Sequence, residues 1–130
     1  MIVAFDTSIL IDMQRKYQPT LDAIRKLVYP HGNPAYLPFT SYFEFYEGIL
    51  EKSPKNFKKS YAFLQKFPVL HPTQQTAEIL AALRKSYKRK GVDLPVSDLL
   101  IAAQVKEHNL LLVTKDKDFK QIDEIKCVVL

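Results

Sequence analysis

The stretch Ile2-Val3-Ala4-Phe5-Asp6 combines a buried-strand pattern with a charge. Its apolar residues predict a short strand inside the protein, and Asp6 follows without a break. An ionised side chain at the end of a buried element needs hydrogen-bond partners, an opposite charge or a metal ion. The same juxtaposition recurs downstream, because Asp98 precedes a run of apolar residues and Asp116 follows a run of β-rich residues.

Strand-like and helix-like segments alternate along the rest of the chain. Short β-rich runs occur at residues 2–5, 35–37, 69–70, 110–113 and 126–129. Helical spacing of apolar residues predicts helices near residues 20–28, 42–50, 54–66, 73–90 and 95–107. Such alternation predicts an α/β fold with a mostly parallel central sheet of about five strands and helices on both faces. A ligand site in this fold lies beyond the carboxyl ends of the strands.

Size and composition describe one folded unit. We expect a single domain over residues 1–130, because this length lies within the usual size of one domain. The content of 47% hydrophobic and 25% charged residues excludes a disordered polyelectrolyte. No apolar run approaches the roughly 20 residues that span a membrane. The chain opens without a basic segment and meets Asp6 too early for a signal peptide, which predicts a cytoplasmic location. Cys127 is the only cysteine, so an internal disulfide is impossible, and it is expected in a buried strand.

The first two acids each have an ordinary structural explanation. Asp6 precedes Thr7 and Ser8, so it could simply cap the start of a helix. Glu44 follows Ser41 by three residues, which is the spacing of a capping box. Either residue taken alone could therefore serve helix formation rather than chemistry.

The later acids are ambiguous in the same way. Asp98 falls in the first turn of the helix that Pro95 opens, where its charge suits the helix dipole by about 0.3 to 1 kcal/mol. The apolar residues after it oppose a buried charge, which favours a ligand role. Asp116 and Asp118 could cap or charge a surface turn.

Taken together, these acids indicate a metal site. Two of them follow strands and two stand near the starts of core helices, so they can converge. Two carboxylates about 5 Å apart repel by roughly 3 kcal/mol at an effective dielectric near 20, so a cluster needs cations or protons. Oxygen ligands without paired histidines or cysteines favour Mg²⁺ or Mn²⁺ over zinc, and His31, His71 and His108 are expected at the surface. A metal-bound water is then the expected nucleophile.

Across its whole length the sequence resembles the PIN domain family, and within it the VapC-type toxins of toxin-antitoxin systems. The resemblance rests on four motifs in order: Val3-Ala4-Phe5-Asp6-Thr7-Ser8, Glu44-Phe45-Tyr46-Glu47-Gly48, Ser97-Asp98-Leu99-Leu100-Ile101-Ala102-Ala103 and Val113-Thr114-Lys115-Asp116-Lys117-Asp118-Phe119. It implies a three-layer α/β domain that cleaves RNA with Mg²⁺ or Mn²⁺. The acidic quartet would be Asp6, Glu44, Asp98 and Asp116.

The resemblance also implies supporting roles and partners. Asp118 matches a further acid of the site, while Ser8 and Thr114 match small hydroxyl residues beside it. Many relatives carry Asn in place of Asp116 and one more residue before the acid that precedes phenylalanine, so the division of labour between Asp116 and Asp118 stays open. A homodimer is implied, as is an antitoxin whose tail inserts into the acidic pocket, with arginine facing the carboxylates.

The net charge of +5 favours anionic partners, since clustering four acids in one pocket leaves the remaining surface strongly basic. Each of two basic segments is equally compatible with an RNA track and with a solvated helix face. One segment is residues 84–90, and the other contains Lys52, Lys55, Lys58 and Lys59.

Two other functions compete with a ribonuclease. A receiver-like phosphoacceptor also carries an aspartate at a strand end, but this chain lacks an adjacent acidic pair there, and Glu44 and Asp98 would have no purpose. A noncatalytic RNA-binding or scaffold domain with a PIN-like fold would keep the architecture without metal-dependent cleavage.

Overall fold

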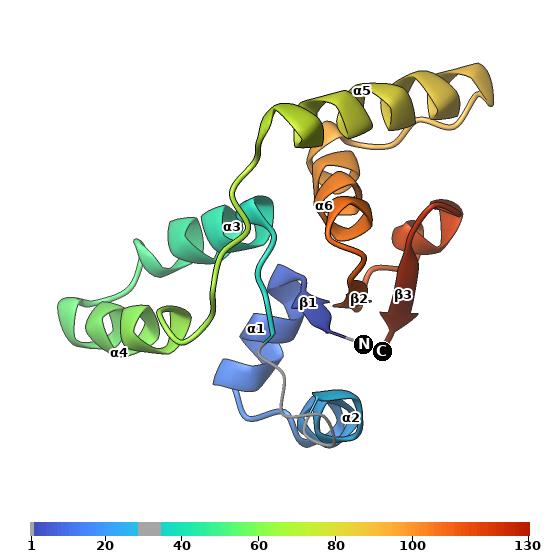
Figure 1. Ribbon diagram of the computed structural model, residues 1–130. Helices are drawn as coiled ribbons and strands as arrows, with labels where there is room; N and C mark the ends of the chain where they lie inside the picture. The colour runs from blue at the N-terminus through green and yellow to red at the C-terminus, as the bar shows by residue number, and fades with distance from the viewer. Residues whose placement is uncertain (1, 29–34) are drawn as a thin grey trace.

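The computed structural model describes residues 2–28 and 35–130 (Figure 1). In chain order the elements are β1 (Val3–Phe5), α1 (Thr7–Gln14), α2 (Gln18–Val28), α3 (Phe39–Ile49), α4 (Pro54–Leu64), α5 (Gln74–Arg89), α6 (Val96–Glu107), β2 (Leu111–Thr114), η2 (Lys117–Gln121) and β3 (Lys126–Val129). The predicted loop at residues 30–34 and the expectation for His31 lie outside the described residues.

The strands form a parallel sheet in the order β1-β2-β3. The prediction of about five strands was too high, because residues 35–37 and 69–70 contribute only single parallel bridges, Ala4 to Tyr36 and Leu37 to Val69. Proline explains their brevity, since it has no N–H to donate to a ladder. Pro38 follows Leu37, and Pro68 immediately precedes Val69. These bridges still extend the sheet beyond β1.

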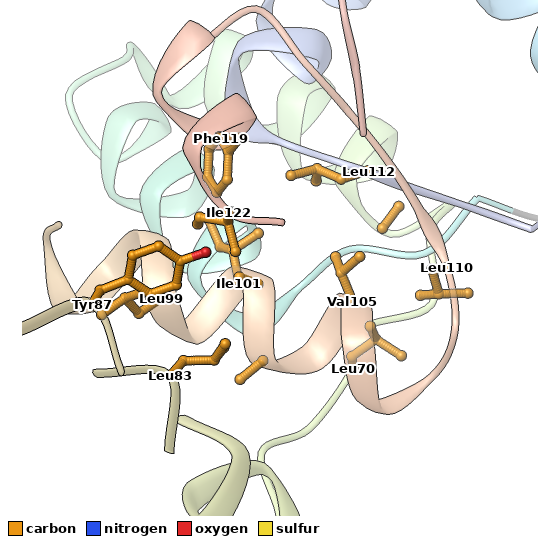
Figure 2. Packing of buried hydrophobic residues seen from close by; sticks show 13 residues of the cluster. Leu70, Leu83, Tyr87, Leu99, Ile101, Val105, Leu110, Leu112, Phe119 and Ile122 are labelled. Carbon is orange, nitrogen blue, oxygen red and sulfur yellow. The ribbon is translucent and has the colours of Figure 1, made fainter. Parts of the chain in front are cut away.

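Apolar side chains leave the sheet on both faces, as continuous strand hydrophobicity predicts. Val3, Phe5 and Val113 belong to one core cluster, which includes residues of α1 and α3. Ala4 and Leu112 belong to another, which includes residues of α5 and α6 (Figures 1 and 2). Alternating residues of one strand thus pack into the core clusters on opposite faces of the sheet. The predicted three-layer α/β architecture is confirmed.

Helix ends follow local sequence chemistry in most places. Asp6 caps α1, and its side chain accepts a hydrogen bond from the backbone of Thr7. Thr73 and Thr76 form a reciprocal capping box at the start of α5. Gly91 follows the end of that helix with a φ of 72°, a conformation that glycine adopts without steric cost.

The capping explanation for Glu44 was wrong. Helix α3 begins at Phe39 after Pro38, so Ser41 already lies inside the helix. Within the described residues, the buried Ser41 hydroxyl has no hydrogen-bond partner. Glu44 consequently has no capping role.

Among the described residues, none of the helices has both the length and the apolar character that crossing a bilayer requires. Cys127 lies in β3 as expected, although it is only half-buried. His71 and His108 are exposed, as predicted.

Candidate functional site

Four elements supply the acids that the sequence singled out. Asp6 stands between β1 and α1, Glu44 lies on α3, and Asp98 lies in the first turn of α6. Asp116 follows β2 and caps η2. Because β1 and β2 are parallel neighbours, Asp6 and Asp116 leave the same edge of the sheet.

Hydrogen bonds hold Asp6 in one orientation. Its Oδ1 accepts from the backbone N–H of Thr7 at 2.8 Å, and its Oδ2 accepts from the hydroxyl of Thr114 at 2.7 Å. Both Asp6 and Thr114 are buried. The capping explanation is therefore correct for Asp6, but capping occupies only one of its two oxygens.

The segment after β2 is fixed by the same hydroxyl. Thr114 Oγ1 accepts from the backbone N–H of Asp116 at 3.0 Å, so one side chain connects the two predicted metal ligands. Asp116 Oδ1 then accepts from the backbone N–H of Asp118 at 2.9 Å. Ser8 contributes from the other side, where its Oγ accepts from the backbone N–H of Lys115 at 3.2 Å. Ser8 and Thr114 thus each accept a hydrogen bond from the segment that carries Asp116.

Three of the carboxyl groups have raised pKa values. Burial raises the pKa of Asp98 from 3.8 to about 6, with further contributions from Asp116, Asp6 and Asp118. Burial also raises the pKa of Asp6, against hydrogen bonds from Thr114 and Thr7 that lower it, and Asp116 adds to the rise. Partial loss of solvent, followed by the charges of Asp6 and Asp98, raises the pKa of Glu44.

The charges that raise these pKa values all belong to other carboxylates. Each of Asp6, Glu44 and Asp98 responds to at least one further member of the set. Asp118 acts on Asp98, although its own side chain is exposed and Asp116 is half-buried. The tertiary structure thus brings the acids into one electrostatic cluster that carries excess negative charge.

In the part of the chain that the structure describes, no three Asp, Glu, His or Cys side chains are arranged to hold a metal ion as they stand. The donor set nevertheless suits Mg²⁺ or Mn²⁺, because all of its members are carboxylates. Their mutual repulsion is also the condition that a divalent cation relieves. On these grounds the chemistry of the residues fits a hard cation, although their side chains are not arranged to coordinate one as they stand.

An ion pair beside the site was not predicted from the sequence. Lys115 Nζ lies 2.9 Å from Asp12 Oδ2, and the Thr20 hydroxyl donates to the same oxygen at 2.6 Å. The ammonium group of Lys115 also lies 5.1 Å from the ring centroid of Tyr17. The available signal was an acid directly after the apolar run Ile9-Leu10-Ile11 on α1.

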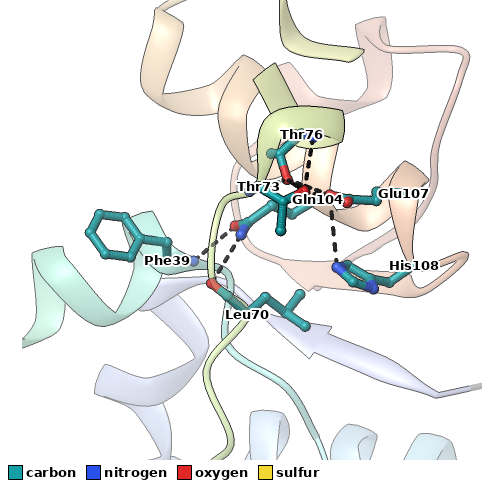
Figure 3. A network of polar contacts seen from close by, with 7 residues as sticks. All are labelled: Phe39, Leu70, Thr73, Thr76, Gln104, Glu107 and His108. Carbon is teal, nitrogen blue, oxygen red and sulfur yellow. Dashed lines mark hydrogen bonds and ion pairs between the residues drawn. The ribbon is translucent and has the colours of Figure 1, made fainter. Parts of the chain in front are cut away.

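Gln104 is a second residue that the sequence analysis missed. It lies on α6 with 0% exposure, where its amide oxygen accepts from the backbone N–H of Phe39 at 2.9 Å. Its amide nitrogen donates to the carbonyl of Leu70 at 2.9 Å (Figure 3). Since Pro38 offers no capping side chain, Gln104 satisfies a backbone donor at the start of the helix that carries Glu44.

A groove adjoins the acidic cluster between α1 and α3. It has a volume of about 340 Å³ and is lined by Thr7, Ile11, Gln14, Arg15, Glu44, Phe45, Gly48, Ile49 and Lys52. Glu44 belongs both to the groove and to the cluster. Of the nearby aromatic residues, Tyr42 and Tyr46 pack against the core, whereas Phe43 is 52% exposed.

Solved structures of similar architecture cover nearly the whole chain. One chain of a toxin-antitoxin complex from Klebsiella pneumoniae shares 26% identity with a TM-score of 0.77, covering 98% of this chain and 96% of that one. A chain of VapBC2 from Rickettsia felis, bound to a promoter DNA fragment, shares 23% identity with a TM-score of 0.85 and covers 99% and 98%. A chain of VapBC-1 from nontypeable Haemophilus influenzae shares 20% identity with a TM-score of 0.83 and again covers 99% and 98%.

Comparison with curated proteins gave no match. The sequence matches the PIN domain over residues 3–125. This match includes all four acids of the predicted quartet and the supporting hydroxyls of Ser8 and Thr114. The chain belongs to the PIN domain family.

Proposed function

We propose that this protein is an endoribonuclease that depends on Mg²⁺ or Mn²⁺, and that it is the toxin of a VapBC-type pair. The observation that carries the proposal is the convergence of Asp6, Glu44, Asp98 and Asp116 from four elements, where burial and neighbouring carboxylates raise the pKa of Asp98 to about 6. A structural role alone gives no reason to gather acids from four elements at one edge of the sheet. Perturbed ionisation of this kind is concentrated at functional sites.

In this proposal Asp6, Glu44, Asp98 and Asp116 hold the metal, and Asp118 adds negative charge at the rim. When bound, a divalent ion supplies Lewis acidity toward the phosphate and toward water. Thr114 keeps Asp6 and Asp116 in register through its two hydrogen bonds. In this proposal the side chains of the protein orient the metal ligands.

The expected protein partners are an antitoxin and a second copy of the chain. Support for an antitoxin comes from the similar fold of chains in the toxin-antitoxin complexes from Klebsiella pneumoniae and Haemophilus influenzae. An arginine side chain could pair with the acidic cluster in two hydrogen bonds and take the place of the cation. RNA remains the proposed substrate.

RNA cleavage by purified protein tests the activity directly. Wild type with millimolar Mg²⁺ should cut single-stranded RNA, and chelation should stop the reaction. Asp98→Asn should lower the rate at least a hundredfold, because it removes a charged ligand. Asp22→Asn is the matched control, since it makes the same change on an exposed residue of α2.

Equal rates in wild type and Asp98→Asn would reject the metal site. Metal-independent binding without any new RNA ends would instead favour the noncatalytic scaffold. The phosphoacceptor alternative leaves the interaction among Asp6, Glu44 and Asp98 unexplained. Labelling of Asp6 by a small phosphodonor would restore it.

A further inference from the structure

The groove between α1 and α3 is lined by charged residues of both signs. Glu44 lies in its wall, and Thr7 connects it to the neighbouring Asp6. Lys52 follows Glu44 by eight residues and lies in the turn after the end of α3 at Ile49. Arg15 lines the same groove from the end of α1. One part of the groove therefore borders the acidic cluster, and its other charged residues are cations.

The lysine is held in place by a small polar network. Lys52 Nζ donates to the hydroxyl of Ser60 at 3.1 Å, and the amide nitrogen of Gln14 donates to the same oxygen at 2.7 Å. Ser60 is buried on α4. Side chains fixed in advance lose less conformational entropy when they bind a ligand.

The rest of the groove offers apolar surface and open space. Ile11 is 38% exposed, whereas Phe45 and Ile49, which also line the groove, are buried. A Cβ atom added to Gly48 would meet no heavy atom within 4 Å. The helix backbone is thus accessible there, one turn beyond Glu44, next to apolar surface that a ribose or a base could cover.

We propose that this groove binds the segment of single-stranded RNA that flanks the cleaved phosphate. Arg15 and Lys52 would pair with phosphates, and the apolar part of the groove would accept a sugar or base. The inference rests on the proposed ribonuclease activity, and it assigns a location to the substrate. It selects Lys52 from the basic segments of the sequence.

The charge pattern favours RNA over a peptide at this position. An arginine-bearing peptide would be attracted by Glu44 but repelled by Arg15 and Lys52. RNA, a polyanion, would be attracted by both Arg15 and Lys52, and a bound metal would offset its repulsion by the Glu44 carboxylate.

A second groove provides the comparison. It has a volume of about 620 Å³ and is lined by Ala77, Leu80, Ala81, Arg84, Lys85, Lys88, Arg89 and Val96. Its lining carries four cations against two in the groove between α1 and α3, but it has no carboxylate of the acidic quartet in its wall.

Binding of a fluorescent single-stranded RNA of about ten nucleotides tests the assignment. The measurements use Asp98→Asn protein, in which cleavage should be at least a hundredfold slower, so that affinity is measured separately from activity. Adding Lys52→Gln or Arg15→Gln should each raise Kd about five- to tenfold and reduce the salt slope by about one. Adding Lys58→Gln or Lys88→Gln should change Kd less than twofold, because these lysines lie outside the groove.

Gly48→Leu tests the space without changing charge. Leucine is the better helix former by about 0.8 kcal/mol, so the melting temperature should stay the same or rise. RNA affinity should nevertheless fall at least tenfold, because the side chain would occupy the open groove.

Unchanged RNA affinity in Gly48→Leu would overturn the inference and leave the groove to a protein partner. An equal or larger loss in Lys88→Gln would also overturn it, because binding would then follow general charge or the second groove. If the groove variants weaken binding but wild type never cleaves RNA, the proposed activity fails while the RNA site stands. If wild type cleaves RNA but all groove variants bind RNA with unchanged affinity, the RNA site fails while the proposed activity stands.

Discussion

Lys115 Nζ lies 2.9 Å from Asp12 Oδ2, and this ion pair ties the segment after β2 to α1. Lys115 stands between Thr114, which bonds to Asp6, and Asp116, the proposed fourth ligand. The pair therefore supports the geometry of the acidic cluster from outside. Its side chains are only partly exposed, at 39% for Lys115 and 11% for Asp12.

Asp12→Asn should lower the free energy of unfolding at pH 7 by about 1 to 2 kcal/mol, because it removes the charge that holds Lys115. Burial acts to raise the pKa of Asp12, but hydrogen bonds from Thr20 and Lys115 outweigh it and lower that pKa below 3.8. The stabilisation is consequently present above pH 4 and is lost as the pH falls below it. Urea unfolding at pH 7 and pH 3 measures this, and equal losses at both would contradict it.

Thr114→Val should destabilise the protein by about 1 to 3 kcal/mol. The replacement keeps the shape but leaves a buried Asp6 oxygen and the Asp116 N–H without their partner. Metal affinity should fall with stability, because both proposed ligands lose their orientation. Thr114→Ser should recover most of both losses. Full metal affinity in the valine variant would show that the hydroxyl does not orient the site.

Stability of the metal-free protein should decrease as pH rises from about 4 to 6. Asp98 has a pKa of about 6 in the folded protein against 3.8 ordinarily, so the folded state keeps its proton longer. Within that interval the unfolded chain binds fewer protons, and the free energy of unfolding falls with pH. After allowance for solvent screening the change is about 1 kcal/mol. Thermal melts in chelator should show this slope, and Asp98→Asn should flatten it.

Mg²⁺ or Mn²⁺ should raise the melting temperature at pH 7. A cation at ten times its Kd stabilises the folded state by about 1.4 kcal/mol, which corresponds to roughly 3–6 °C for a chain of this size. Asp98→Asn should abolish most of the shift, while Asp22→Asn should preserve it. Identical curves with and without millimolar metal in wild type would contradict a cation site among these carboxylates.

Gln104→Leu should cost about 2 to 3 kcal/mol, because it leaves the Phe39 N–H and the Leu70 carbonyl unpaired. The effect on Glu44 should be indirect, through the start of α3, so metal affinity should fall less than in Thr114→Val. Chemical denaturation and metal titration on the same samples separate the two effects. A fully stable Gln104→Leu variant would mean that water or a shifted helix satisfies those groups.

Local sequence patterns predicted several elements closely. The run at residues 126–129 coincides with β3, and the predicted helix at residues 54–66 differs from α4 only at its end. Strand number was overestimated, because a β-rich run shows propensity but not whether a neighbouring strand pairs with it. The Ser41 and Glu44 spacing was misleading for a related reason, since Pro38 starts α3 earlier than the motif implies.

The sequence by itself determined the α/β class, the family and the identity of the acids, because apolar periodicity and short motifs are local properties of the chain. Only the tertiary structure decided how those acids influence one another, since Asp6 and Asp116 are separated by more than a hundred residues. It also decided the partners of Asp12 and Gln104 and the position of Lys52 in the groove beside Glu44. These relationships depend on packing between distant segments, where distance and burial set the strength of every charge and hydrogen bond.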